Sequence, residues 1–348
     1  MMVATENFRI GRLRSLILMS LAVLALALAG CGRPKDPVHV SGQIAAGHYE
    51  VTVEDPGSMT AADIRQRIAR LGGDPAKGLY AGPIAAFNQG PADQWVDVPQ
   101  PLFALVQVAL KIGKETGGAV DITDGSIRSV WGLTGRRRPT QVPTTGQLNS
   151  AREDSGLGLV ELRNDPAALR KSRSRVELAL AGLGQSDAVD RMAAALSDMG
   201  AEHYLVSLQG SLVARGAKTD GKPWQIGLER PAGNAKQIDR IVGLRDAAMA
   251  TAGDNQRLVD IDGFRVSPEL DPRTGRSLAH SGLSVTVVAD SAVRADLLAR
   301  ALLVMGPQVG MRYAEGHKIA AYFFYLDGKG RMRTIHTRSF APVLNNRE

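Results

Sequence analysis

Residues 271–306 constrain the fold more than any other stretch, because signals for a turn, a strand and a helix follow one another there. Residues 271–275 contain a Pro and a Gly that together frame a tight turn. Residues 284–289 begin with Ser or Thr alternating with Val, which predicts a strand with one polar and one apolar face. Asp-Ser at 290–291 supplies N-cap side chains for a helix with apolar residues at helical spacing, and Gly-Pro at 306–307 is expected to end it.

The rest of the chain predicts a mixed architecture. Helical and strand patterns alternate irregularly, which favours an α+β fold with antiparallel pairing over a doubly wound parallel sheet. With 44% hydrophobic and 22% charged residues the composition is that of a globular protein, so we predict one large domain over residues 41–348, with mixed or antiparallel sheets flanked by helices. Helices are predicted at 60–71, 101–116 and 186–199, and strands at 203–208, 212–216, 224–228, 284–289, 318–326 and 331–337.

The N-terminus has the pattern of a secretory signal peptide. Arg9, Arg12 and Arg14 form a basic region, and Leu16–Ala29 is a run of apolar or small residues. This run is about fourteen residues long, whereas a helix that spans a bilayer needs about twenty. We therefore predict that residues 1–30 are a signal peptide rather than a permanent membrane helix.

Cys31 is the only cysteine, and it ends a Leu-Ala-Gly-Cys segment that matches the lipobox of bacterial lipoproteins. A single cysteine excludes an intramolecular disulfide and a cysteine-based metal site. We predict that Cys31 is lipidated, that residues 31–40 form a tether, and that the protein is anchored to a bacterial membrane and faces the periplasm. Gly32 leaves the choice between inner and outer membrane open. An ordinary signal peptide with a chance cysteine is the alternative.

The net charge of +7 restricts the class of partner. The basic clusters at 136–138 and 170–175 have no interleaved aromatic residues, so a membrane surface or an anionic small molecule is favoured over nucleic acid. The six histidines show neither an H-x-x-x-H nor an H-E-x-x-H spacing. The sequence also has no Walker A loop and no G-x-G-x-x-G motif.

Several short motifs, found in a fixed order, resemble those of the ApbE-type flavin transferases. Each motif is weak alone, but their succession along nearly the whole chain after residue 40 is specific. The motifs are Phe87-Asn88 with Trp95-Val96-Asp97-Val98, Thr116-Gly117-Gly118-Ala119-Val120-Asp121-Ile122-Thr123 with Trp131-Gly132, Trp224-Gln225-Ile226-Gly227-Leu228 with Pro231, Ala250-Thr251-Ala252-Gly253-Asp254, and the stretch 271–306.

The resemblance implies an FAD:protein FMN transferase that uses Mg²⁺, moves FMN from FAD to a Ser or Thr of an extracytoplasmic flavoprotein, and releases AMP. It implies an ApbE-like fold, with FAD and an acceptor flavoprotein at the membrane or in the periplasm as partners. The positions that it assigns to FAD are Ala119, Val120, Asp121, Ala179, Thr251 and Leu270, the last through its backbone. Those that it assigns to the metal are Asp296 and the backbone carbonyl of Gly182 or Gly184. No catalytic residue is assigned.

The chain departs from the family pattern at several of these positions. Ala179 replaces an Asp, Gln185 replaces a Lys or Glu, and Pro268 replaces a His. Arg300 stands where the family has a Thr ligand to the metal, which puts Mg²⁺ in doubt because arginine is always protonated and has no lone pair for a metal. The family's M-G-T and N-x-G-G motifs read Ala45-Ala46-Gly47 and Ser207-Leu208-Gln209-Gly210 here.

These departures leave alternatives open. Arg300 either pairs with Asp296, one helical turn away, and closes the metal site, or it replaces the metal as a cation on the diphosphate. Asp121 is either a flavin contact or a capping carboxylate, and Gly182 and Gly184 form either a phosphate loop or a plain turn. The protein is accordingly a transferase or a catalytically impaired flavin-binding or assembly lipoprotein; a weaker third possibility is an FAD diphosphatase.

Overall fold

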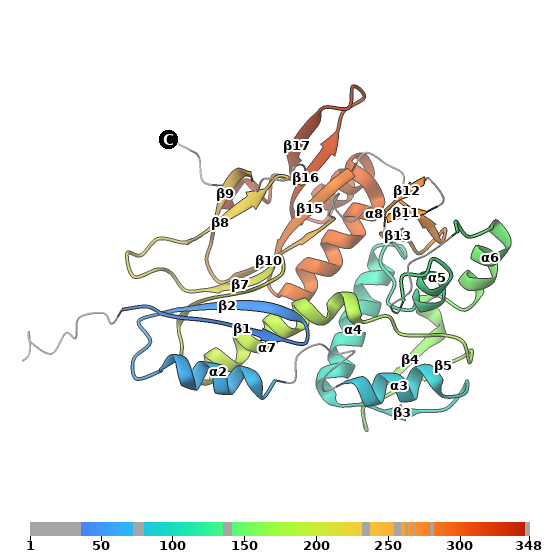
Figure 1. Cartoon of the computed structure of the whole chain (residues 1–348), viewed down its shortest axis with the longest axis horizontal. Coiled ribbons are helices and arrows are strands. Elements are labelled where there is room, and N and C mark those ends of the chain that lie inside the picture. Colours follow the sequence, from blue (N-terminus) through green and yellow to red (C-terminus); the bar gives the residue numbers. More distant parts are fainter. Residues whose placement is uncertain are drawn as a thin grey trace, which may run out of the picture. The chain divides into compact units, whose positions relative to one another are not determined.

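An eight-stranded antiparallel sheet runs through the molecule (Figure 1). The computed structural model describes residues 36–71, 80–134, 141–231, 237–253, 259–261, 264–267, 269–278 and 282–344. The predicted signal peptide, Cys31, Asp254 and Pro268 lie outside these ranges. In spatial order the strands are β1 (Val38–Ile44), β2 (Gly47–Glu54), β6 (His203–Leu208), β7 (Ser211–Arg215), β10 (Ala247–Ala252), β15 (Gly282–Ala289), β16 (Ala320–Leu326) and β17 (Met332–His336). β1 begins inside the segment predicted as a tether, because Val38–Ile44 pair with β2.

Helices cover one face of this sheet, and small antiparallel sheets complete the fold. The helices are α2 (Ala61–Ala69), α3 (Ala81–Gln89), α4 (Gln100–Glu115), α5 (Gly125–Val130), α6 (Thr145–Glu153), α7 (Gly184–Asp198) and α8 (Ala292–Gly316), with 3₁₀ turns η1 (Leu157–Leu159), η2 (Ala181–Leu183) and η4 (Ala341–Val343). The small sheets are formed by β3 (Val96–Asp97), β5 (Ala168–Lys171) and β4 (Val160–Arg163), by β8 (Trp224–Glu229) and β9 (Ile238–Leu244), by β11 (Val259–Ile261) and β12 (Phe264–Val266), and by β13 (Leu270–Asp271) and β14 (Arg276–Ser277). The predicted α+β class is thus confirmed.

The sheet is buried on both faces at its centre. On the helical face, Val285 and Val287 of β15 share a core with α4 and α8. On the opposite face, β8 and β9 pack against residues of β10 and β16. The predicted polar face of β15 exists, but Ser284 and Thr286 are buried too, so the strand does not border solvent as its alternation suggested.

Helix α8 is the element that positions the site. Ser291 caps its N-terminus as predicted, and the Asp190 carboxylate of α7 accepts hydrogen bonds from the backbone N–H groups of Ala292 and Val293 at 2.7 and 2.9 Å. The predicted end at Gly306-Pro307 is instead a kink: Gly306 leaves the helical conformation with φ +75°, and the helix resumes at Pro307. Proline is tolerated there because the first turn of a helix needs no N–H donor from it.

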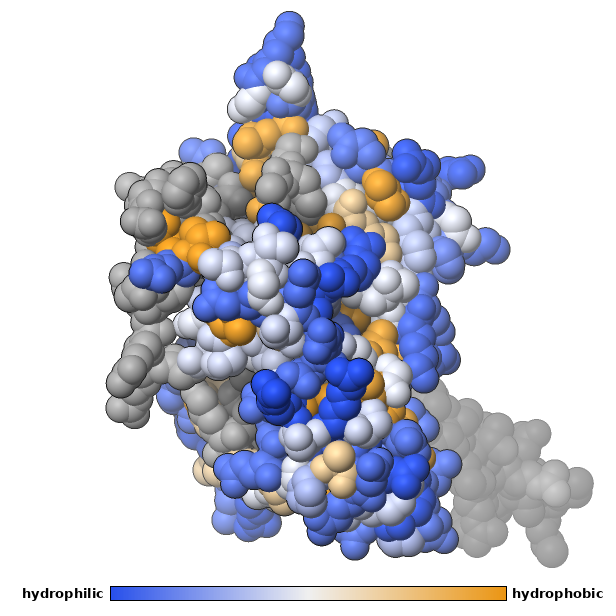
Figure 2. All heavy atoms as spheres, turned by 90° about the vertical axis from the view of Figure 1, so that its right-hand side faces the viewer, coloured by the Kyte–Doolittle hydropathy of each residue, from blue (hydrophilic) through white to orange (hydrophobic). Residues whose placement is uncertain are grey.

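The face of the molecule that carries α5 and α6 is predominantly hydrophilic, with apolar atoms in small separate areas (Figure 2). The large apolar side chains that are exposed among the described residues are Val142, Ile238, Val309, Leu326 and Ile335, of which the last two lie on the paired strands β16 and β17. None of the helices in the described ranges combines the length and the hydropathy needed to cross a bilayer.

Candidate flavin and diphosphate site

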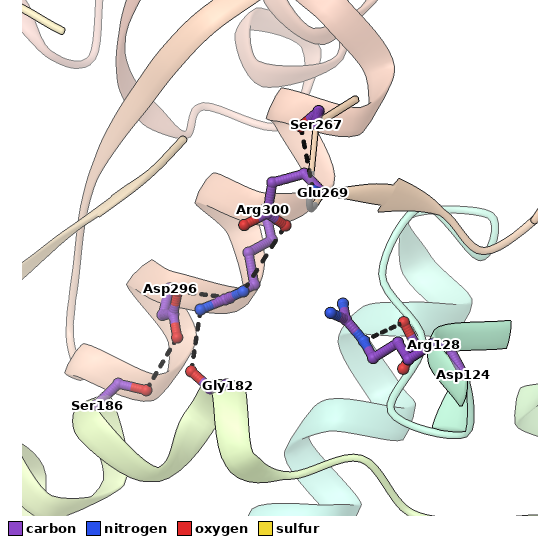
Figure 3. Close-up of polar contacts among 8 residues, drawn as sticks. All are labelled: Asp124, Arg128, Gly182, Ser186, Ser267, Glu269, Asp296 and Arg300. Atoms are coloured by element: carbon purple, nitrogen blue, oxygen red, sulfur yellow. Dashed lines mark hydrogen bonds and ion pairs between the residues drawn. The ribbon is translucent and has the colours of Figure 1, made fainter. Parts of the chain in front are cut away.

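Arg300 links α8 to the turn that opens α7 (Figure 3). Its Nε donates to Oδ1 of Asp296 at 2.8 Å, and its Nη2 donates to the backbone carbonyl of Gly182 at 2.9 Å. Asp296 lies one turn earlier on α8, so both side chains leave the same side of the helix. The other carboxylate oxygen, Oδ2, accepts a hydrogen bond from the hydroxyl of Ser186 on α7 at 3.1 Å. Four residues from two helices and a turn therefore form one network.

In this network, burial and the neighbouring groups shift the pKa of Asp296 in opposite directions. Asp296 is 4% exposed and Ser186 fully buried, and burial raises the pKa of the Asp296 carboxyl while Arg300 and Ser186 partly offset that shift. The Asp296 carboxylate raises the pKa of Arg300 further above its ordinary value, so the guanidinium keeps its charge at every physiological pH. Nη1 of Arg300 lies 3.9 Å from Oε2 of Glu269, which is an ion pair but longer than a hydrogen bond.

A second ion pair lies opposite this network in Figure 3. Arg128 donates through Nε to Oδ2 of Asp124 at 2.8 Å, one turn apart at the start of α5. Asp124 is 2% exposed, and burial raises the pKa of its carboxyl, with Arg128 and the charge of Arg300 acting in the opposite direction. The i,i+4 spacing of this pair was readable in the sequence, whereas Ser186 and Glu269 join the site only through tertiary contacts.

The loop after α4 brings the predicted flavin positions Ala119, Val120 and Asp121 to α8. Gly117 and Gly118 adopt φ of +62° and +76°, which ends the helix where the sequence predicted and turns the chain. Ala119 then packs, fully buried, against Ala301 and Val304 of α8, with Val120 at the edge of the same cluster.

Asp121 shapes this loop. Its Oδ1 accepts hydrogen bonds from the backbone N–H and the hydroxyl of Thr123, both at 2.7 Å. The Thr123 hydroxyl in turn accepts from the backbone N–H of Gly156 at 2.6 Å. Burial raises the pKa of Asp121, against the effect of these hydrogen bonds. One oxygen of Asp121 therefore has the capping role that was one of the two alternatives.

The segment that leads into η2 is held against the same loop. The backbone N–H of Ala179 donates to the carbonyl of Ile122 at 2.7 Å. One residue earlier, the Asn88 side chain accepts from the N–H of Leu178 at 2.8 Å and donates to its carbonyl at 3.2 Å. The buried ammonium of Lys171 donates to three backbone carbonyls, those of Asn88, Ser174 and Val176. The predicted positions 119–121, 179 and 182 thus come together.

Thr251 and Leu270 are placed differently. Thr251 is exposed and lies on the face of β10 opposite α8, where its hydroxyl and that of Thr286 form a hydrogen bond of 2.7 Å. Leu270 is 2% exposed and its side chain packs with Trp131 and Ile127; the resemblance assigns only its backbone to FAD. The predicted turn follows it, with the N–H of Gly275 donating to the carbonyl of Asp271 at 2.8 Å.

Three of the departures from the family pattern meet in one place. Nε2 of Gln185 lies 3.3 Å from Oε1 of Gln209 and 3.4 Å from the carbonyl of Ala46. Gly47 lies beside them with φ +137°, a conformation that residues with a side chain rarely adopt. The changes at 45–47, 185 and 207–210 therefore form one polar contact rather than three unrelated substitutions.

The oxygens assigned to a metal do not fit a divalent cation. Asp296 Oδ1 and the Gly182 carbonyl both accept from Arg300, and Asp296 Oδ2 accepts from Ser186. Gly184, the third predicted metal residue, is buried at the first position of α7. A guanidinium donates only and has no lone pair for a metal. Within the described ranges, no group of three or more His, Cys, Asp or Glu side chains is arranged to hold a metal ion.

Comparison with known proteins identifies the family. The ApbE family is matched over residues 46–323. The FAD:protein FMN transferase of Vibrio cholerae is 31% identical over 94% of this chain and 98% of its own length, and that of Haemophilus influenzae is 28% identical over 93% and 96%. The solved structure of the flavin transferase ApbE from Vibrio cholerae superposes with a TM-score of 0.79, at 29% identity, over 90% of this chain and 100% of its own. The chain belongs to the ApbE family.

Proposed function

We propose that this protein is an FAD:protein FMN transferase, which moves FMN from FAD to a Ser or Thr of an extracytoplasmic flavoprotein. The observation that carries the proposal is the similarity to transferases of that name over almost their whole length. The convergence of residues 119–121, 179 and 182 beside α8 supports it, because a nucleotide that is to be cleaved has to be held by several elements at once.

In this reaction the hydroxyl oxygen of the acceptor attacks the phosphorus of the FMN half of FAD. A new P–O bond forms, the bond from that phosphorus to the bridging oxygen breaks, the bridging oxygen leaves with AMP, and the hydroxyl proton passes to solvent. The start of α7 suits the diphosphate, because the helix has no side-chain cap and Gly182 in the preceding turn is exposed. Backbone N–H groups and the dipole at a helix N-terminus favour an anion.

A second candidate, a catalytically impaired flavin-binding or assembly lipoprotein, is favoured by one observation. Arg300 is bonded to both Asp296 and Gly182, where the resemblance implies a magnesium ion. The proposed mechanism therefore uses no magnesium ion.

The test is incubation of the purified protein with FAD and an extracytoplasmic flavoprotein as the acceptor. The transferase predicts an acceptor mass increased by FMN and an equal amount of AMP. Bound FAD with neither product would favour the impaired flavin-binding protein. Free FMN and AMP without an adduct would favour an FAD diphosphatase.

We also propose that the protein is anchored by lipid on Cys31 and faces the periplasm. The lipobox and the absence of any other cysteine support this. Labelled palmitate should be incorporated by the wild type and not by Cys31→Ser, and equal labelling of the two would contradict the proposal.

A further inference from the structure

We propose that the guanidinium of Arg300 is the built-in cation of the diphosphate site, so that the protein binds FAD without a divalent metal ion. This inference rests on the proposed binding of FAD. The sequence left two roles open for Arg300: closing the metal site, or replacing the metal as the cation on the diphosphate. We infer the second.

The geometry leaves part of the guanidinium available. A guanidinium has five N–H donors in a planar fork. Asp296 and Gly182 each take one of them, from Nε and Nη2, and Nη1 makes only the long contact to Glu269. The Arg300 side chain is 25% exposed, whereas that of Asp296 is 6% exposed. An arginine that only closed the metal site would be expected to bury its guanidinium and to use all five N–H groups in hydrogen bonds to the protein.

The surroundings fix the position and the charge of this cation. Asp296 and the Gly182 carbonyl hold the guanidinium at two points, so little side-chain entropy is lost when a phosphate binds. Gly182 also leaves room, since a Cβ there would lie 3.4 Å from Nη1. A guanidinium binds a phosphate by donating two parallel N–H···O hydrogen bonds, and Arg300 would bind the diphosphate of FAD in this way.

The same contacts exclude a metal. A divalent ion bound to Asp296 Oδ1 and the Gly182 carbonyl would replace the two hydrogen bonds that Arg300 donates to these oxygens. The ion would then lie next to the positive charge of Arg300. Glu269 is the acidic group in the best place to compete with the diphosphate for Nη1. Neutralising Glu269 should therefore tighten FAD binding, which a site closed by Arg300 would not show.

The test is titration of the purified full chain with FAD, in EDTA and in millimolar Mg²⁺. We expect equal wild-type affinities in the two conditions and a loss of roughly 10- to 100-fold in both for Arg300→Gln. Arg300→Thr should bind weakly in EDTA and recover in Mg²⁺, and Glu269→Gln should bind more tightly than the wild type. Arg294→Gln is the matched control, since it removes a more exposed arginine of the same helix and should change nothing.

Two outcomes would overturn the inference while leaving the proposed function intact: tighter FAD binding by the wild type in Mg²⁺, or unchanged binding by Arg300→Gln with a wild-type melting curve. Mn²⁺ binding followed by electron paramagnetic resonance without FAD is a separate readout. It should be detected for Arg300→Thr and not for the wild type. Mn²⁺ binding by the wild type would overturn the inference alone, and a wild type that binds no FAD in either condition would refute the proposed function together with the inference.

Discussion

The two sides of the candidate site hold their residues by different means. On the loop side, which comprises residues 119–123 and 178–180, the short hydrogen bonds are mainly donated by backbone N–H groups: those of Thr123, Leu178 and Ala179 donate to Asp121, Asn88 and Ile122, respectively. On the helix side, which comprises Gly182, Ser186, Asp296 and Arg300, charged and hydroxyl side chains make the contacts.

The departures from the family pattern lie on both sides. On the loop side the T-G-G-A-x-D-I-T motif is present, but Ala179 replaces an Asp. The helix side carries Arg300, and Gln185 with its partner Gln209 lies beside it. The loop side is thus held by backbone hydrogen bonds, whereas positions 179 and 185, which are charged in the family pattern, are uncharged here and position 300 carries a charge.

The largest effect is expected from breaking the loop side at Asn88. Asn88→Ala leaves the N–H and the carbonyl of the buried Leu178 without their partner, which should lower the free energy of unfolding by about 2–3 kcal/mol. Urea unfolding measures this loss, and FAD titration should show weaker binding because residues 178–180 are released. Gln89→Ala, at the exposed end of the same helix, is the control. Equal stability of the two variants would contradict the distinction between the two sides.

An intermediate effect is expected at the contact between Gln185 and Gln209. In a double-mutant cycle of Gln185→Ala and Gln209→Ala, the coupling should be about 0.5–1 kcal/mol, the size of one net hydrogen bond. The same cycle between Gln209 and Arg300 should show coupling within about 0.3–0.5 kcal/mol of zero. Strong coupling there would mean that the two groups of substitutions act as one unit.

The smallest effect is expected outside both sides, in the turn between β16 and β17. Backbone N–H groups, chiefly that of Arg331, hold the pKa of Asp327 at about 2, below its ordinary value of 3.8. Because the folded pKa is the lower one, the ionised carboxylate adds stability above about pH 4, and this is lost as the pH falls towards 2. Between pH 5 and 2.5 the wild type should lose slightly more thermal stability than Asp327→Asn, by calorimetry. Identical pH profiles would refute this role, and FAD affinity should not change.

The fold was largely predictable, and the site only in part. Apolar residues at helical spacing, ended by glycines, identified α4 and α7 within a few residues. The pair Asp296–Arg300 follows from its spacing along one helix. The contact from Arg300 to the Gly182 carbonyl does not, because it joins positions 118 residues apart in the chain. The same holds for Ser186, whose hydroxyl has no sequence motif to mark it.

The sequence also did not reveal that polar side chains of β15 are buried. Ser284 and Thr286 alternate with valines as in a strand that borders water, yet both side chains are buried. The helix break at Gly306-Pro307 was expected to be an end and proved to be a kink, since proline is compatible with a new first turn. Local sequence specifies the conformation of an element but not which other elements will pack against it.

The carboxylate of Asp190 fixes the position of α7 relative to α8 along the helix axes. It binds the first backbone N–H groups of α8. Arg300 lies about 12 Å further along α8, and there it meets Gly182 in η2, just before the start of α7. Two attachment points on one pair of helices remove their freedom to shear. A displacement of either helix along its axis would break both attachments together, so the spacing between the turn and the guanidinium is set by the helical rise rather than by a flexible loop.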